Sequence, residues 1–561
     1  MAKIVVDPIT RIEGHLRIEA EIKNGKIADA WSSSTMFRGI EKILKGRDPR
    51  DAWFWTQRFC GVCTTVHSIA SIRAVENALK IQIPPNAQLI RNIIIGIQNV
   101  QDHVIHFYHL HALDWVDITS ALKADPAKTS ALAASLSDWP NNSTTYFKSV
   151  QDKLKSFVAS GRLGPFANAY WGHPAYRLPP EANLMATAHY LEALDWQRRF
   201  IKIHAMLGGK NPHLQSFLVG GMATPVDVDS QNALNADTIA ALNELIAEGR
   251  KFVTQVYLPD VLAVASFYKD WAEIGGNKNF LSYGDFPQSD DEPASFYFPR
   301  GLVLNQELKL VSFDPQKITE DVTRSWYETG KPLHPSVGET KPLAGDKLKA
   351  AVPDTQSKDG KYTWLKAPRY DGQPMEVGPL AQCLVSYVGG NKEIKDTTDM
   401  VLKKLEVGPD ALFSTLGRIG ARGIKCLVNA KACEKWVMDL IENVRKGDTR
   451  TFTSYKLDES INGMGAGLND VARGSLGHWV NIEKGKIKNY QQVVPSTWNL
   501  GPTDGAGKKG PVENALIGTP VTDPKKPLEI LRTVHSFDPC IACAVHVIDP
   551  HTNEVYKFRV S

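Results

Sequence analysis

Residues 58–67 read Arg-Phe-Cys-Gly-Val-Cys-Thr-Thr-Val-His, and residues 538–546 read Asp-Pro-Cys-Ile-Ala-Cys-Ala-Val-His. Each stretch holds a Cys-x-x-Cys pair followed by a histidine, and the two stretches lie at opposite ends of a chain with only seven cysteines. Thiolates and imidazoles are the side chains that bind soft transition metals. We therefore expect the two ends of the chain to meet around one metal site in the centre of the fold.

The spacing of the pairs argues against a small zinc module. In a zinc ribbon the two pairs lie about 15 to 20 residues apart, and the metal itself folds the module. Here Cys63 and Cys540 are 477 positions apart, and a chain with 43% hydrophobic residues can fill a core without a metal. Four thiolates suit zinc, an iron–sulfur cluster, or nickel with iron, and spacing alone does not choose. The remaining cysteines, Cys383, Cys426 and Cys433, are expected to be ordinary buried residues.

Composition excludes two classes of partner. The chain has 65 Lys and Arg against 61 Asp and Glu, without long basic runs, so nucleic acid is not an expected partner. No targeting signal and no membrane-spanning segment are visible, so membrane contact is expected only through other proteins.

The residue pattern predicts an α+β fold that is predominantly α-helical, with long central helices and peripheral β-hairpins that frame the cysteine motifs. Alternation of apolar and polar residues predicts hairpins over 15–31 and 479–494. Apolar residues spaced three and four apart predict one long helix from about 85 to 117. Further helices are expected at about 180–207, 232–270 and 394–445, with Pro259 as a candidate break in the second. Frequent Gly, Pro, Asp and Lys predict a loop-rich lobe over 275–375.

Two further patterns invite a functional reading that we set aside. His103 and His106 share a helix face, but their apolar neighbours favour packed, hydrogen-bonded histidines over metal ligands. The run Gly463-Met464-Gly465-Ala466-Gly467 suggests a dinucleotide-binding loop only weakly, because no strand pattern precedes it. We expect a flexible turn there.

The residues around both cysteine pairs resemble the two metal-binding signatures of the nickel–iron hydrogenase large subunit, and the overall character is similar to the membrane-associated respiratory group. Further blocks match along the whole chain in order: Arg11-Ile12-Glu13-Gly14-His15, Phe37-Arg38-Gly39-Ile40-Glu41, His111-Ala112-Leu113-Asp114-Trp115, Gly208-Gly209-Lys210-Asn211-Pro212-His213 and Val494-Pro495-Ser496-Thr497-Trp498-Asn499. The resemblance implies one large-subunit domain over residues 1–546, with the 275–375 lobe within it.

The resemblance also implies a metal centre. Cys60 and Cys540 would be terminal ligands of nickel, and Cys63 and Cys543 would bridge nickel to an iron that carries carbonyl and cyanide ligands. Cysteine rather than selenocysteine at position 540 implies the plain nickel–iron type. The other implied contacts surround the centre: His67 beside a bridging sulfur, Val494 and Ser496 hydrogen-bonded to a cyanide, and a magnesium ion held by Glu41, the main-chain carbonyl of Gln492 and His546.

The implied reaction is the reversible heterolytic cleavage of H2 into protons and electrons. Cys540 would accept the first proton and relay it to Glu13, with the guanidinium of Arg473 above the metals. Asp102 and Asp538 resemble the acidic residues that accompany this arginine. One departure is Ala472, because the family usually has proline immediately before the arginine, and alanine frees the backbone that sets the pose of Arg473.

The family also implies partners and a location. The chain itself has no cysteine set for a relay cluster, so electrons would pass to a small subunit that carries iron–sulfur clusters, across a large apolar interface. The respiratory group implies the periplasmic side of the inner membrane, reached by export with that partner; a cytoplasmic location is the alternative. Residues 547–561 would be a maturation extension that a dedicated endopeptidase removes after His546, once insertion factors have supplied nickel.

Two other functions compete with this reading. An H2-sensing regulatory homologue would use the same centre to signal, but such proteins generally lack the cleaved extension. A structural zinc or redox-switch protein would contain stoichiometric zinc and no nickel.

Overall fold

A computed structural model describes residues 2–161, 164–288, 295–351 and 360–541. Helices make up about half of the described chain, far more than strands, which confirms the predicted α+β class with helices predominant. The long helices are α3 (Val66–Leu79), α4 (Pro85–Ile105), α7 (Thr144–Ala159), α8 (Pro180–Phe200), α10 (Ala236–Phe252), α14 (Lys392–Leu405) and α15 (Thr415–Arg445). The shorter helices are α1 (Ile40–Leu44), α2 (Ala52–Thr56), α5 (Ile118–Ala121), α6 (Pro126–Leu136), α9 (Lys202–Gly208), α11 (Leu258–Ser266), α12 (Gly345–Ala351), α13 (Pro379–Val388), α16 (Pro495–Leu500), α17 (Pro511–Leu516) and α18 (Leu528–Ser536).

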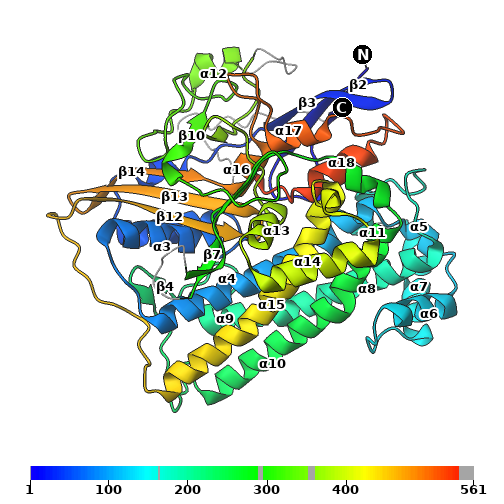
Figure 1. Ribbon diagram of the computed structural model, residues 1–561, viewed down its shortest axis with the longest axis horizontal. Helices are drawn as coiled ribbons and strands as arrows, with labels where there is room; N and C mark the ends of the chain where they lie inside the picture. The colour runs from blue at the N-terminus through cyan, green and yellow to red at the C-terminus, as the bar shows by residue number, and fades with distance from the viewer. Residues whose placement is uncertain (1, 162–163, 289–294, 352–359, 542–561) are drawn as a thin grey trace.

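Helices α4 and α15 form the centre of the helical core, and Figure 1 shows them lying side by side with α10 and α8 next to them. Gly96 permits the close approach of α4 and α15, because a Cβ atom at this position would lie 2.4 Å from Cys433 Sγ. The predicted helix from 85 to 117 is observed as α4, continued by a π-helical turn over His106–His111 and a 3-10 turn over Ala112–Asp114.

Two other helical predictions require correction at their boundaries. The predicted helix 394–445 is two helices, α14 and α15, because Gly408 and Pro409 interrupt the pattern and begin a 3-10 turn. The predicted helix 180–207 is α8 and α9, which meet at Ile201. The range 232–270 stays helical past Pro259, because a π-helical turn over Val253–Tyr257 leads into α11 and places the proline in its first turn.

Both predicted hairpins are confirmed, and each belongs to a three-stranded antiparallel sheet. The first sheet has the order β1-β2-β3 and the second β12-β13-β14. Their strands are β1 (Ala2–Val6), β2 (Leu16–Lys23), β3 (Lys26–Ser34), β12 (Gly463–Val471), β13 (Gly474–Glu483) and β14 (Lys486–Val493). In the first sheet Leu16, Ile18 and Ala20 are fully buried, as the alternation predicts.

The glycine-rich run at 463–467 is the start of strand β12, so the expectation of a flexible turn was wrong. The glycines are required because β12 lies directly on the backbone of α3 (Figure 1). A Cβ atom on Gly467 would lie 2.0 Å from the carbonyl oxygen of Ala70, and one on Gly465 would lie 2.2 Å from that of Ala74. Helix and strand can approach this closely only where no side chain separates them.

The range 275–375 contains short strands joined by loops, together with helix α12. Its strands are β6 (Phe280–Ser282), β7 (Asp285–Pro287), β8 (Phe296–Phe298), β9 (Gly301–Val303), β10 (Ile318–Asp321) and β11 (Ala367–Tyr370); the remaining strands, β4 (Phe217–Leu218) and β5 (Gly221–Met222), lie outside it. These strands form three antiparallel two-stranded sheets, β6–β9, β7–β8 and β10–β11.

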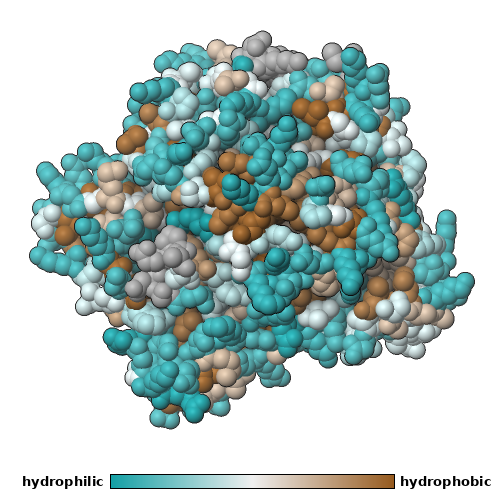
Figure 2. Space-filling model, viewed as in Figure 1, coloured by the Kyte–Doolittle hydropathy of each residue, from teal (hydrophilic) through white to brown (hydrophobic). Residues whose placement is uncertain are grey.

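The face shown in Figure 2 is mostly hydrophilic, with hydrophobic side chains gathered near its middle. Some large apolar side chains are exposed near the first cysteine motif or on β12: Phe54, Leu218, Phe452 and Met464. Across the described ranges of the chain, no helix combines the length and apolarity needed to cross a bilayer.

Candidate metal centre

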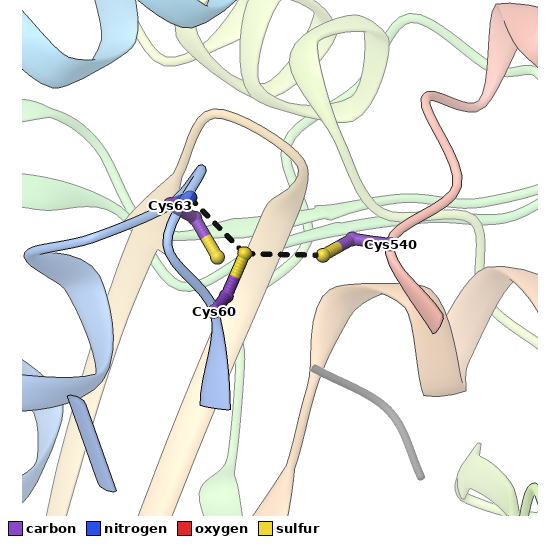
Figure 3. A group of neighbouring side chains, drawn as sticks. All are labelled: Cys60, Cys63 and Cys540. Atoms are coloured by element: carbon purple, nitrogen blue, oxygen red, sulfur yellow. Dashed lines mark hydrogen bonds between the residues drawn. The ribbon is translucent and has the colours of Figure 1, made fainter. Parts of the chain in front are cut away.

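Three of the four predicted thiolates meet in the structure. Cys60 and Cys63 lie on the loop before α3, and Cys540 lies on the segment that follows α18 (Figure 3). The sulfur atoms of Cys60 and Cys540 are 3.6 Å apart, and all three sulfurs lie within 4.8 Å of one another. All three cysteines are buried. Thiolates this close in a dry environment suit a soft metal ion, which would compensate their mutual repulsion.

The fourth predicted thiolate, Cys543, lies outside the described residues, as do His546 and the predicted extension 547–561. The approach of the C-terminal segment is nevertheless fixed as far as Ile541. Its main-chain N–H donates to the carbonyl of Glu13 at 2.6 Å, and Glu13 pairs with Cys540 in a parallel β-bridge. The two ends of the chain therefore hold each other at the site.

Main-chain contacts position each cysteine. The guanidinium of Arg38 donates to the carbonyls of Arg58 and Phe59, which fixes the loop before Cys60. The main-chain N–H of Cys63 donates to Cys60 Sγ at 3.2 Å, an arrangement that stabilises a thiolate. The main-chain N–H of Cys540 donates to Ser496 Oγ at 3.0 Å, which ties the C-terminal segment to the start of α16.

A small cavity lies beside the sulfurs, and apolar side chains form most of its wall. Its lining includes Cys63, Cys540, Val66, Val471, Ala472, Leu476, Val494 and Pro495, together with His67, Arg473 and Ser496. Val494 and Ser496, the two residues predicted to contact a cyanide, both reach it. Such a wall excludes water and leaves space for small diatomic molecules.

Arg473 lines the cavity and lies between two carboxylates. Its Nη1 donates to Asp102 Oδ2 at 3.2 Å, and its Nη2 lies 3.0 Å from Asp538 Oδ1. Burial alone would lower the pKa of Arg473, but Asp538 and Asp102 outweigh burial and hold that pKa well above its usual range. Burial raises the pKa of Asp102 to about 7, although Arg473 opposes the rise. Arg473 is therefore a fixed cation beside the sulfurs.

Glu13 is half-buried next to Cys540. Burial raises the pKa of its carboxyl, and the charge of Cys60 adds to the rise, while Arg473 and Arg38 oppose it. The raised pKa favours proton uptake by this carboxyl group, which lies on a segment paired with Cys540 and can therefore take part in a proton relay.

His67 is buried behind the cysteines. Its Nδ1 lies 3.1 Å from His478 Nε2, and His478 Nδ1 lies 2.7 Å from the hydroxyl of Tyr490. Burial lowers the pKa of His67 to about 4, so its ring is neutral at physiological pH and carries one N–H. The hydrogen-bonded chain behind it fixes the orientation of that ring.

The two described members of the predicted magnesium site come from neighbouring elements. Glu41 lies on α1 and Gln492 on β14, and these elements contact each other. Burial raises the pKa of Glu41, and the ammonium of Lys366 lowers it. Lys366 Nζ also lies 2.9 Å from Glu320 Oε2. The surroundings of Glu41 are therefore a charged, buried patch that extends beyond the residues named from the sequence.

The histidines that were set aside as ligands do not form a metal group among the described residues. His106 Nε2 lies 2.7 Å from the carbonyl of His535, as expected for a packed histidine. His103 is fully buried, but neither ring nitrogen has a hydrogen-bond partner among the described residues, so the prediction of a hydrogen-bonded histidine was wrong at this position. Cys383, Cys426 and Cys433 are buried, as expected.

The sequence analysis missed some supporting residues. Gln98 donates to the carbonyl of Val62 at 3.0 Å and to Asp102 Oδ1 at 2.8 Å, so it joins the cysteine loop to the partner of Arg473. His478 orients His67, and Arg38 holds the loop before Cys60. Arg38 lies within a matched sequence block, but Gln98 and His478 lie in no motif that singles them out.

The fold and the site together define a metalloprotein whose two ends converge on a buried thiolate centre beside a small apolar cavity. A family model described as nickel-dependent hydrogenase matches residues 38–546, and one described as HoxL-like matches residues 3–33. The chain is 50% identical to the uptake hydrogenase large subunit of Rhizobium leguminosarum bv. viciae, covering 100% of this chain and 97% of that protein. It is 46% identical to the hydrogenase-2 large chain of Escherichia coli K12, covering 100% and 99%.

Solved structures agree with the sequence comparisons. The Ni-Fe-Se hydrogenase from D. vulgaris Hildenborough in its as-isolated oxidized state superposes with a TM-score of 0.78 at 34% identity, covering 97% of this chain and 100% of that chain. The chain belongs to the nickel-dependent hydrogenase family. It is the large, catalytic subunit of a hydrogenase with a nickel–iron centre, and it works with a small subunit.

Proposed function

We propose that the chain binds nickel through Cys60, Cys63, Cys540 and Cys543, and iron through the two bridging thiolates Cys63 and Cys543, with carbonyl and cyanide as the remaining iron ligands. The observation that carries this proposal is the meeting of three buried sulfurs from opposite ends of the chain. When bound, such a centre supplies a Lewis-acidic site for H2 and takes up its two electrons. The net reaction releases two protons and two electrons from each H2.

Cys540 and Glu13 carry the first proton away from the centre. The thiolate of Cys540 is the base next to the reacting molecule, and the carboxyl group of Glu13 receives the proton from it. Two observations support this order. Glu13 pairs with Cys540 through the main chain, and the pKa of Glu13 is raised, mainly by burial and to a smaller extent by the charge of Cys60.

Arg473 stabilises and orients whatever occupies the cavity. Its guanidinium stays charged because Asp102 and Asp538 flank it, and it lines the same cavity as Cys63 and Cys540. The hydroxyl of Ser496 accepts a hydrogen bond from Cys540, so its own proton remains available to a cyanide on iron. The apolar wall around Val494 supports a dry environment for such strong-field ligands.

A magnesium ion is proposed at Glu41, the main-chain carbonyl of Gln492 and His546. The adjacency of α1 and β14 supports this site, and a carboxylate with a carbonyl suits a hard octahedral cation. The ion would offset the electrostatic cost of burying Glu41.

The small subunit is proposed to carry iron–sulfur clusters and to cover apolar surface near the first cysteine motif. The exposed side chains of Phe54, Leu218 and Phe452 support such an interface. Two further steps rest on the resemblance to the respiratory group. The chain is exported with this partner to the periplasmic side of the inner membrane, and a dedicated endopeptidase removes residues 547–561 after nickel insertion.

Infrared spectroscopy combined with metal analysis of the purified heterodimer tests the centre. We expect about one nickel and one iron per large subunit beyond the partner's clusters, with carbonyl and cyanide bands in a region where proteins do not absorb. H2-dependent reduction of an artificial acceptor should accompany the bands. Stoichiometric zinc without nickel would contradict the proposal and favour a structural site, whereas bands with negligible turnover would favour an H2 sensor.

A further inference from the structure

The turn that carries Arg473 is held at its base by hydrogen bonds to the Asp470 carboxylate. Arg473 lies in the two-residue loop between β12 and β13, where Val471 pairs with Gly474. Asp470, next to the turn, accepts hydrogen bonds from the main-chain N–H of Tyr283 at 3.2 Å and from Ser475 Oγ at 2.7 Å. These contacts fix the base of the turn but leave its Val471 side to be held by another element.

Gln382 on α13 supplies that second support. Its Nε2 donates to the main-chain carbonyl of Val471 at 3.0 Å, and its Oε1 accepts a hydrogen bond from Lys425 Nζ. Gln382 and Lys425 are each 1% exposed. The start of α13 also touches the turn, because a Cβ atom on Gly378 would lie 3.3 Å from the carbonyl oxygen of Arg473. A chain of two hydrogen bonds thus joins α15, through α13, to the turn.

Burial of the Lys425 ammonium group is energetically unfavourable. Burial lowers its pKa to about 8, although the carboxylates of Asp470 and Asp285 oppose the change. A methionine of similar length would pack here without the cost of desolvating an ammonium group. The ammonium does, however, orient the amide of Gln382, since a donor bound to Oε1 directs Nε2 toward Val471.

We propose that Lys425 and Gln382 are positioning residues that set the pose of Arg473 over the cysteine cavity. Neither side chain lines that cavity, so they act through the main chain of the turn and not on the substrate. These contacts compensate for Ala472, because alanine, unlike proline, leaves the backbone before Arg473 free to rotate. This inference rests on the proposed role of Arg473.

The test compares substitutions along this chain in the purified heterodimer. Gln382→Leu removes both hydrogen bonds, and Gln382→Glu keeps an acceptor for Lys425 but removes the amide donor to Val471. Both are expected to lower turnover per bound nickel by about tenfold or more, because small displacements at a reacting site cost about that much. In crystal structures the distance from Arg473 Nη1 to Asp102 Oδ2, 3.2 Å here, should change.

Lys425→Met separates positioning from stability. Because the substitution removes a buried charge, the melting temperature should stay the same or rise, while turnover per nickel should fall. In the double variant Lys425→Met with Gln382→Leu, turnover should fall no further than in Gln382→Leu alone, because both residues act through one carbonyl.

Gln151→Leu is the matched control. Gln151 is also a buried glutamine, and its Nε2 donates to the carbonyl of Ala124 at 2.6 Å, far from the cysteines along the chain. We expect this variant to lower the melting temperature without changing turnover per nickel. The inference is overturned if Gln382→Glu leaves both turnover and the position of the Arg473 guanidinium unchanged, or if the effects of Lys425→Met and Gln382→Leu are additive. A wild-type protein without H2 turnover would instead contradict the proposed function, and the crystallographic comparison would still decide the positioning role.

Discussion

Cys60 and Cys540 are 480 residues apart in the sequence, and their sulfur atoms are 3.6 Å apart in the structure. No local element could bring them together. The main-chain pairing of Glu13 with Cys540 and the hydrogen bond from Cys540 to Ser496 hold the C-terminal segment against the first cysteine loop. The whole fold is therefore needed to assemble the metal centre. Removal of the metal should leave the fold largely intact.

We predict that Cys540→Ala abolishes nickel binding and H2 turnover while the protein stays folded. A core of this size does not depend on a metal, so circular dichroism should match the wild type and the nickel content should fall more than about tenfold. Cys383→Ala is the matched control, because Cys383 is also buried and its Sγ donates to the carbonyl of Ala421. Retention of nickel in Cys540→Ala would contradict the assignment.

Glu13→Gln should lower H2 oxidation by about a hundredfold or more, because an amide of the same size cannot relay a proton. Nickel content and the carbonyl and cyanide bands should stay unchanged, since Glu13 is not a metal ligand. Turnover with an artificial acceptor and infrared spectra measure the two effects. Glu21→Gln, on the strand β2 that follows the Glu13 segment, is the control that should retain full activity. Full activity of Glu13→Gln would exclude this residue from the proton path.

Ala472→Pro is predicted to stabilise the turn and to keep activity within about twofold. Ala472 is the first of the two loop residues and has a negative φ, and proline is favoured at such a position. Its N–H donates to no hydrogen bond among the described residues, so proline would remove none. The gain should be about 0.4–1 kcal/mol, from reduced freedom of the unfolded chain. Ala466→Pro is the contrast, because it removes the N–H that donates to Asn77. Thermal melting and turnover assays check both, and a destabilised Ala472→Pro would show that the turn needs the freedom of alanine.

The pair of His189 and Asp260 should make stability depend on pH. Burial alone would lower the pKa of His189, but Asp260, whose Oδ2 lies 2.8 Å from Nδ1, outweighs burial and raises that pKa above 6.5. The stabilisation is therefore complete below the unfolded pKa and is lost as pH rises through the folded pKa. Asp260→Asn should cost about 3 kcal/mol at about pH 5.5 and clearly less at about pH 9.

Melting temperatures at the two pH values measure this effect. Asp152→Asn is the control, because Asp152 pairs with Lys148 on the exposed face of α7 and should show little change at either pH. Equal losses for Asp260→Asn at both pH values would mean that His189 is neutral in the folded protein.

The sequence predicted those elements whose periodicity is local. The hairpin over 15–31 and the helix that begins at 85 follow from apolar spacing alone. The glycines of 463–467 were misread because their role is a contact with α3, which lies almost 400 residues earlier in the chain. A glycine selected for close approach and a glycine selected for a turn look the same in one sequence.

The same limit applies to the site. The cysteines could be found because two Cys-x-x-Cys pairs are rare in a chain with few cysteines. Gln98, His478 and Gln382 could not, because each is an ordinary polar residue within a helix or strand. Their roles depend on which backbone group or ring the fold brings within hydrogen-bond distance, and spacing in the sequence does not encode that.

The direct seating of β12 on α3 has a consequence for how this enzyme can vary. Helix α3 leads away from Cys63, and β12 leads to Arg473, so the separation of cysteine loop and arginine turn is set by main chain against main chain. Natural or engineered substitutions of side chains elsewhere would leave this separation unchanged. A single methyl group at Gly465 or Gly467 would increase the distance between α3 and β12, and with it the distance between the cysteine loop and the arginine turn.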